Sequence, residues 1–226
     1  MGFYDRTDAG KRLVAPLSKY KGQDVVALAL PRGGVPVAAP IARALAAPLD
    51  LVLVRKIGVP FQPELAMGAV ADGGVPFVVR NEDVIAAAGV SQPQFEAVCS
   101  RELEEIERRR RFYLGGRARP EVEGRIAVVV DDGVATGATT RAALRSVRAR
   151  RPKKLVLAVP VAPPDTLAAL EQEVDEAICL EVHADFGAIG FFYADFRQIT
   201  DEEVIAILDE FGSPAAADRD GADCRS

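Results

Sequence analysis

The sequence predicts an α/β fold with a central, mainly parallel sheet flanked by helices. Short apolar runs rich in valine and leucine recur along the chain, and stretches of helical composition separate them. The runs are nearly continuous rather than alternating, which is typical of strands that helices cover on both faces. With 226 residues, the chain is long enough to bury one large core.

Five apolar runs predict the strands of this sheet, and other patterns predict what lies between them. Residues 67–80 predict a hairpin, because two short runs meet at Asp72-Gly73-Gly74 and glycine adopts the backbone angles of a tight turn. A long polar helix is expected from about Ser91 to Leu114, with Pro93 in its first turn. The run DEEVIAILDEF predicts a closing amphipathic helix. The five strand runs are residues 24–30, 49–56, 125–131, 154–160 and 177–182.

Composition and charge exclude several classes of protein. No segment approaches ~18 uninterrupted apolar residues, and the N-terminus lacks the apolar core of a signal peptide, so a cytoplasmic protein without a membrane partner is expected. A net charge of -5 disfavours nucleic acid as a partner. Cys99, Cys179 and Cys224 form no C-x-x-C pair, which argues against a zinc ribbon or a disulfide framework.

The run RELEEIERRRRF in the long helix has two interpretations, a nucleic-acid-binding patch or a solvated face that pairs with itself. The second is favoured, because three glutamates precede arginines by four residues, in the order that stabilises a helix. The pairs are Glu104 with Arg108, Glu105 with Arg109, and Glu107 with Arg111.

Ligands of open α/β sheets bind outside the carboxyl ends of the strands, so the residues after each strand are the candidate site. Arg32, Gly33 and Gly34 follow the first strand. The glycines let the backbone approach a ligand closely, and Arg32 offers a forked donor suited to phosphate. A simple strand-to-helix turn is the alternative.

Two cations, Arg55 and Lys56, lie at the end of the second strand and precede a loop rich in glycine and proline, expected over residues 58–67. This pattern predicts a mobile segment that brings positive charge to an anion and excludes water. The alternative is that both side chains only reach solvent.

The third strand ends in two adjacent carboxylates, Asp131 and Asp132. The small and hydroxyl residues after them would place successive N–H groups at a helix N-terminus, which predicts a phosphate site. The carboxylates would then accept hydrogen bonds from hydroxyls of the sugar that carries the phosphate; a capped turn is the alternative. The run is neither a Walker A loop nor a dinucleotide fingerprint. Its residues are Thr136, Gly137, Ala138, Thr139 and Thr140.

The run VVVDDGVATGAT resembles the phosphoribosyl-pyrophosphate (PRPP) signature of type I phosphoribosyltransferases: hydrophobic residues, two acids, three variable residues, then Thr-Gly-x-Thr. The resemblance covers roughly residues 24–165 and extends more weakly to the rest. It implies a central parallel sheet with a smaller hood over the acceptor. The expected organisation is one domain over residues 1–212, with its core at about 22–165, a hood from the N-terminal and 177–200 segments, a helical insertion at about 81–115, and a disordered tail at 213–226.

The resemblance also implies a reaction, in which a nitrogen displaces pyrophosphate at C1 of the ribose of PRPP, with Mg²⁺ bound to the sugar phosphate. It assigns Asp131 and Asp132 to the ribose hydroxyls, and the stretch from Ala135 to Thr140 to the 5′-phosphate. Arg32, Gly33 and Gly34 correspond to the pyrophosphate loop, where the family commonly carries a cis peptide, expected near Arg32–Gly33. Arg32 and Lys56 would assist the departure of pyrophosphate.

The acceptor is a small nitrogenous molecule, a nucleobase or similar, that the motif leaves open. Ala135 stands where the 6-oxopurine branch carries an aspartate, as in the adenine branch. Residues 190–196 nevertheless resemble the aromatic and acidic segment of the 6-oxopurine enzymes. Phe191, Phe192 and Tyr193 are therefore hood candidates and Asp195 a metal candidate, with a core aromatic cluster as the alternative. His183 is expected to be a hydrogen-bonded surface or hinge residue.

A catalytic phosphoribosyltransferase of nucleotide salvage is the favoured function, because Arg32 and Lys56 are retained. A non-catalytic PRPP-binding regulator is the alternative, and a PRPP synthase is disfavoured because such enzymes also need an ATP site. Either the enzyme or the regulator could be a homodimer.

Overall fold

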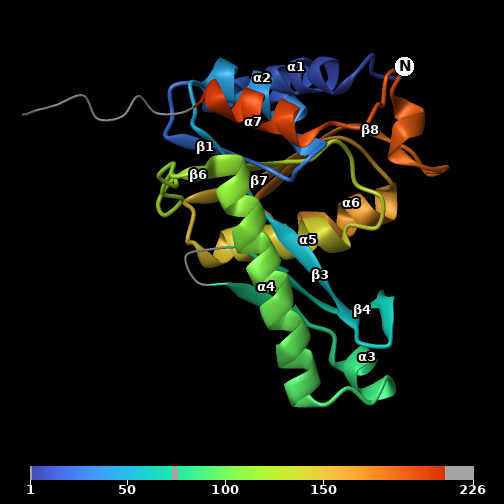
Figure 1. Ribbon diagram of the computed structural model, residues 1–226. Helices are drawn as coiled ribbons and strands as arrows, with labels where there is room; N and C mark the ends of the chain where they lie inside the picture. The colour runs from blue at the N-terminus through green and yellow to red at the C-terminus, as the bar shows by residue number, and fades with distance from the viewer. Residues whose placement is uncertain (1, 73–75, 212–226) are drawn as a thin grey trace, which may run out of the picture.

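A five-stranded parallel sheet forms the centre of the protein, as the computed structural model of residues 2–72 and 76–211 shows (Figure 1). The order β2-β1-β6-β7-β8 and the uniformly parallel pairing confirm the predicted fold class. The predicted tail, Cys224, and the turn glycines Gly73 and Gly74 lie outside the described residues. The strands are β1 (Val25–Ala29), β2 (Leu49–Leu51), β6 (Ile126–Val130), β7 (Lys154–Ala162) and β8 (Glu176–Val182).

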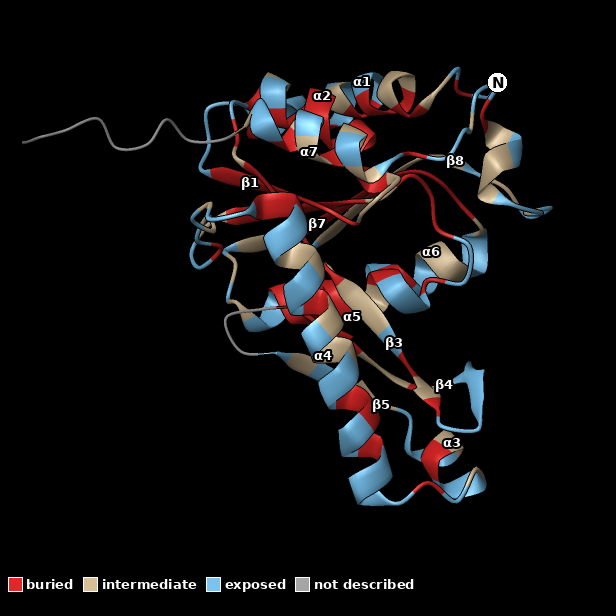
Figure 2. Cartoon of the chain, viewed as in Figure 1, coloured by how far each residue is buried: buried red, intermediate tan, exposed pale blue. Residues whose placement is uncertain are grey.

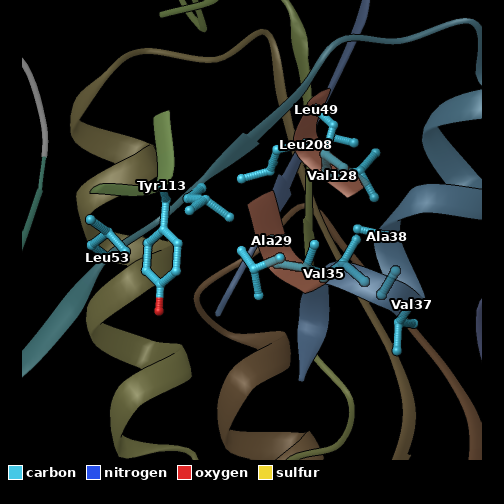
Figure 3. Packing of buried hydrophobic residues seen from close by; sticks show 14 of the residues in the cluster. Ala29, Val35, Val37, Ala38, Leu49, Leu53, Tyr113, Val128 and Leu208 are labelled. Carbon is cyan, nitrogen blue, oxygen red and sulfur yellow. The ribbon is translucent and has the colours of Figure 1, made fainter. Parts of the chain in front are cut away.

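Helices cover both faces of this sheet (Figure 1). Strand residues alternate between the two apolar layers: Val128 of β6 packs with α1, α2 and α7, whereas Val129 packs with α5 and α6. β1, β6 and almost all of β7 are buried, whereas most of β8 is only half-buried (Figure 2). Figure 3 shows the first layer assembled from β1, α2, β2, β6, α4 and α7. The helices are α1 (Arg6–Leu17), α2 (Gly34–Leu45), α5 (Ala138–Ala149), α6 (Pro164–Glu171) and α7 (Asp201–Asp209), with 3-10 turns η1 (Ser18–Tyr20) and η2 (Ile189–Phe192).

A second, antiparallel sheet of three strands extends from the first, and it corrects two predictions. The run at 49–56 is not one strand, because Val52 N–H still bonds to β1 whereas Leu53 N–H donates to Asp72, so the chain changes partner there. The segment 58–67 is largely strand rather than an irregular loop. The hairpin predicted at 67–80 is confirmed as β4 pairing with β5. The strands are β3 (Val54–Val59), β4 (Gln62–Ala71) and β5 (Phe77–Arg80).

The polar helix predicted from Ser91 is confirmed as α4 (Gln92–Leu114), which follows the short α3 (Glu82–Ala87). Ser91 and Gln94 form a capping box, and Pro93 lies in the first turn. Across residues 2–72 and 76–211, no helix has the length and apolar character needed to cross a membrane.

The predicted ion pairs of α4 form only in part. Glu105 accepts hydrogen bonds from Arg109, as expected, and also from Arg108, which the sequence pairs with Glu104. Among the described residues, no ion pair joins Glu107 to Arg111.

Asp72, at the end of β4, joins the second sheet to the core through a buried ionic network. Its carboxylate accepts hydrogen bonds from Arg110 of α4, at 2.7 Å, and from Arg119. The other carboxylate oxygen accepts the Leu53 N–H at 3.0 Å. Arg119 Nε lies 3.7 Å from Asp50 of β2, so two strands and α4 share one charged cluster.

We expect Asp72→Ala to destabilise the protein by about 3–5 kcal/mol, because it leaves two guanidinium groups partly buried without their carboxylate. Thermal unfolding measures the loss as a fall of roughly 6–20 °C in Tm. Asp209→Ala is the matched control, since Asp209 is exposed and pairs with Arg117 at the surface. Equal Tm values for the two variants would contradict a stabilising role for the network.

Candidate functional site

The strand order places a topological switch point between β1 and β6. The chain leaves β1 toward β2 on one side and leaves β6 toward β7 on the other. Ligands of open α/β sheets bind at such a point, outside the carboxyl ends of the strands. Leu30 N–H donates to Val130 O at 2.9 Å, so the segments after β1 and β6 start side by side.

Residues 30–34, which we call loop 1, lie directly against the acidic pair. A cis peptide joins Pro31 to Arg32, one bond before the position near which the resemblance placed it. A methyl group at Gly33 would overlap the carboxylate of Asp132, and one at Gly34 would lie 2.6 Å from Val130 O. The close approach of two backbones requires glycine at position 34, and the Asp132 carboxylate fills the space that a side chain at position 33 would need.

Asp132 is held in place by residues far away in the sequence. Its Oδ2 accepts a hydrogen bond from Arg6 Nε at 2.7 Å, and both side chains are buried. Arg6 also donates to Arg197 O at 2.8 Å and lies over the ring of Phe196, 3.8 Å from its centre. The Tyr193 hydroxyl donates to the backbone carbonyl of Asp132 at 2.6 Å. The position of Asp132 is therefore fixed before any ligand binds.

Asp131 differs from its neighbour because no arginine within residues 2–72 and 76–211 forms an ion pair with it. Its Oδ1 accepts the backbone N–H of Asp132 at 2.9 Å, and its side chain is partly exposed. Burial, and then the charge of Asp132, raise the pKa of Asp131 well above its ordinary value. Hydroxyl donors or a cation brought to this carboxylate would stabilise its ionised form.

Residues 135–140, the phosphate loop, lead into the N-terminus of α5. Gly137 caps the helix with a φ of 75°, a conformation that favours glycine. Thr166 of α6 supports the loop by donating to Ala135 O at 2.8 Å. Thr140 is buried and faces the core, so the loop offers an anion its N–H groups and two hydroxyls rather than three. Exposed in the loop are Ala135, Thr136, Ala138 and Thr139.

Of the two cations after the second predicted strand, the structure brings Arg55 closer to the site. Arg55 lines a small cavity together with Pro31 of loop 1 and Thr139 of the phosphate loop. Lys56 points elsewhere: its Nζ binds Glu64 of the same hairpin at 3.1 Å.

The aromatic candidates divide between core and surface. Tyr193 is buried, and burial raises the pKa of its phenol, so the hydroxyl stays protonated and donates to Asp132. Phe192 packs on Phe186 and on His183, whose Nε2 lies 3.0 Å from a carboxylate oxygen of Glu181. Phe191 is 82% exposed and remains available to a ligand.

Asp195 is exposed, and its Oδ1 accepts the Arg197 N–H at 3.1 Å. Within the part of the chain that the structure describes, no three His, Cys, Asp or Glu side chains converge on a point that could hold a metal. The donors present fit Mg²⁺ bound mainly through a phosphorylated ligand, because Mg²⁺ usually takes one or two carboxylates plus substrate oxygens.

Sequence reasoning missed Arg6, whose guanidinium pairs with the carboxylate of Asp132. No local pattern identifies it, because it precedes its partner by 126 positions. The sequence offers both Arg55 and Lys56 as cations, and the family resemblance points to Lys56. Arg55 and Lys56 are consecutive residues of β3, and consecutive strand residues point to opposite faces, so only one of them can face the candidate site.

Comparisons with known proteins agree with this geometry. A family model described as “Phosphoribosyl transferase domain” matches residues 5–195. Two curated proteins of Mycobacterium tuberculosis are each 48% identical to this chain over 207 residues, which are 92% of it. Both are named “Putative phosphoribosyl transferase”, and they come from strains CDC 1551 / Oshkosh and ATCC 25618 / H37Rv. The chain spans only 46% of the length of these relatives. The crystal structure of TT1426 from Thermus thermophilus is 41% identical with a TM-score of 0.80, over 94% of this chain and 100% of that one.

Proposed function

The chain belongs to the phosphoribosyl transferase domain family, and from that premise we propose that it binds PRPP with Mg²⁺ and transfers the phosphoribosyl group to a nitrogen acceptor, releasing pyrophosphate. One observation carries the proposal: loop 1, the acidic pair and the phosphate loop meet at the switch point between β1 and β6. Each suits a different part of PRPP, namely the diphosphate, the ribose hydroxyls and the 5′-phosphate.

In this proposal the binding residues divide the substrate among them. Asp131 and Asp132 accept hydrogen bonds from the ribose 2′- and 3′-hydroxyls, which also stabilises the ionised form of Asp131. The N–H groups at the start of α5, with Thr136 and Thr139, hold the 5′-phosphate. The fixed position of Asp132 orients the ribose before the reaction, which lowers the entropic part of the barrier.

The proposed reaction breaks the C1–O bond, whose electron pair leaves on pyrophosphate, while the acceptor nitrogen forms the C1–N bond and loses a proton. The chain contributes by holding positive charge near the departing group. Arg32 in loop 1 is one assigned cation, and Lys56 of β3 is the other, although in the free protein its Nζ is bound to Glu64 and not directed at loop 1. Lys56 would exchange Glu64 for the ligand. Mg²⁺, when bound with PRPP, acts as a Lewis acid and template for the same charge.

The acceptor is proposed to be a nucleobase or similar small molecule, as in nucleotide salvage. Phe191 is the hood residue best placed to cover it, because its ring is exposed beside the buried aromatic cluster. Ala135 offers no carboxylate to a 6-oxopurine.

The test is pyrophosphate release from PRPP and Mg²⁺ with a panel of nucleobases and small amines. We expect release with at least one acceptor and none when acceptor is withheld. Tight PRPP binding without release for any acceptor would replace the enzyme with a non-catalytic PRPP-binding regulator. Absence of PRPP binding would reject both.

A further inference from the structure

A cavity of 230 Å³ opens beside loop 1, at the meeting point of α4 and the start of α7. Its volume corresponds to nearly eight water molecules at ~30 Å³ each, so it has room for a small anion. Three of its six lining residues are arginines. The lining, which we call the arginine pocket, comprises Arg32, Arg108, Arg109, Phe112, Tyr113 and Asp201.

Arg109 connects this pocket to the switch point. It also lines the smaller cavity that contains Pro31 of loop 1 and Thr139 of the phosphate loop. Arg109 therefore lines two cavities next to loop 1, one that contains Arg32 and one that contains Pro31. A residue of the helical insertion thus lies at the same edge of the sheet as the predicted site.

The positive charge of the pocket is only partly balanced. Arg108 Nε and Arg109 Nε share one carboxylate, that of Glu105, at 2.7 and 2.8 Å. These hydrogen bonds lower the pKa of Glu105 to about 2, so it stays ionised at neutral pH. Arg32 Nη1 lies 3.7 Å from Asp201, which also accepts the Tyr113 hydroxyl. Three guanidinium groups therefore face two carboxylates, and each guanidinium has five N–H donors to offer.

We propose that the arginine pocket binds the diphosphate group of PRPP and the pyrophosphate it releases, with Arg109 of α4 as a direct ligand beside Arg32. This inference rests on the proposed function and extends the site from the loops of the sheet to α4. Arginine binds phosphate oxygens in a forked, charge-assisted geometry. Glu105 holds Arg108 and Arg109 near the pocket in the free protein and competes with the ligand for them.

The experiment is calorimetric titration of PRPP, pyrophosphate and ribose 5-phosphate, each with Mg²⁺, into the full chain and its variants. Arg109→Ala should weaken PRPP and pyrophosphate binding roughly 10- to 100-fold, the loss expected for one charge-assisted hydrogen-bonding side chain. Ribose 5-phosphate lacks the diphosphate, so its affinity should change less than about twofold by the same reasoning. Arg111→Ala is the matched control, because it removes the same charge from an exposed position of α4.

A second variant is expected to strengthen pyrophosphate binding. Glu105→Gln removes the competing carboxylate and should tighten pyrophosphate binding roughly 2- to 5-fold, as expected for an exposed ion pair. Arg109→Ala binding within twofold of wild type, or an equal loss of ribose 5-phosphate affinity, would overturn the inference and leave the proposed function standing. Wild-type protein that binds pyrophosphate but neither sugar phosphate would instead refute the proposed function.

Discussion

Asp131→Asn is expected to weaken PRPP binding roughly 10- to 100-fold, because the ribose hydroxyls lose a charged acceptor. The unliganded variant should be at least as stable as wild type. In the free protein Asp131 lies beside Asp132 without an arginine of its own, and its pKa is raised by burial and by that neighbouring charge. Calorimetric titration measures the affinity, and thermal unfolding measures the stability.

The stability difference between wild type and Asp131→Asn should depend on pH. Because the pKa of Asp131 is raised in the folded state, the folded protein binds more protons than the unfolded chain above the unfolded pKa, near ~3.9. Wild type therefore loses stability relative to the variant as pH rises from about 4 through the raised pKa. Tm values of both proteins across this pH range measure the difference.

Asp24→Asn is the control for both measurements. It makes the same chemical change just before β1, at the amino-terminal ends of the strands and away from the candidate site. There Asp24 is exposed and pairs with Arg125. Loss of PRPP affinity in this control, or a pH-independent Tm difference for Asp131→Asn, would contradict the account of Asp131.

Arg6→Ala is expected to destabilise the protein by about 3–5 kcal/mol, because it leaves the buried carboxylate of Asp132 unpaired. It also removes the donor to Arg197 O and the cation over Phe196. The Tm should fall by roughly 6–20 °C. PRPP affinity of the folded variant should fall as well, since Asp132 is no longer fixed for the ribose.

The matched control is Arg12→Ala, in the same helix. Arg12 forms an exposed i,i+4 pair with Asp8, and such pairs contribute about 0.3–0.5 kcal/mol. A Tm of Arg6→Ala within 2 °C of the control would show that Arg6 does not hold Asp132.

The parallel sheet could be predicted because it depends on local patterns, and the candidate site was proposed from local patterns as well. A buried strand needs a continuous apolar run, and the segment from Asp131 to Thr140 carries its chemistry in consecutive residues. The split at Val52 and Leu53 could not be predicted, since the apolar pattern continues across it. The pairing with β1 ends where Leu53 exchanges hydrogen bonds with Asp72, 19 residues later.

The supporting residues were beyond sequence reasoning for the same physical reason. Arg6 and Tyr193 reach Asp132 from the two ends of the domain, and Thr166 reaches Ala135 from α6. Helical spacing predicted that Glu105 pairs with Arg109, but not that Arg109 lines a cavity with Arg32 of loop 1. Contacts between distant segments depend on how elements pack, and one sequence does not encode them as a pattern.

A crystal structure of the wild-type protein with PRPP and Mg²⁺ tests the central proposal most directly. We predict the 5′-phosphate at the N-terminus of α5, the ribose hydroxyls on Asp131 and Asp132, and the diphosphate against Arg32. PRPP bound elsewhere would contradict the proposal. So would crystals grown at saturating PRPP that show no PRPP at the carboxyl ends of β1 and β6.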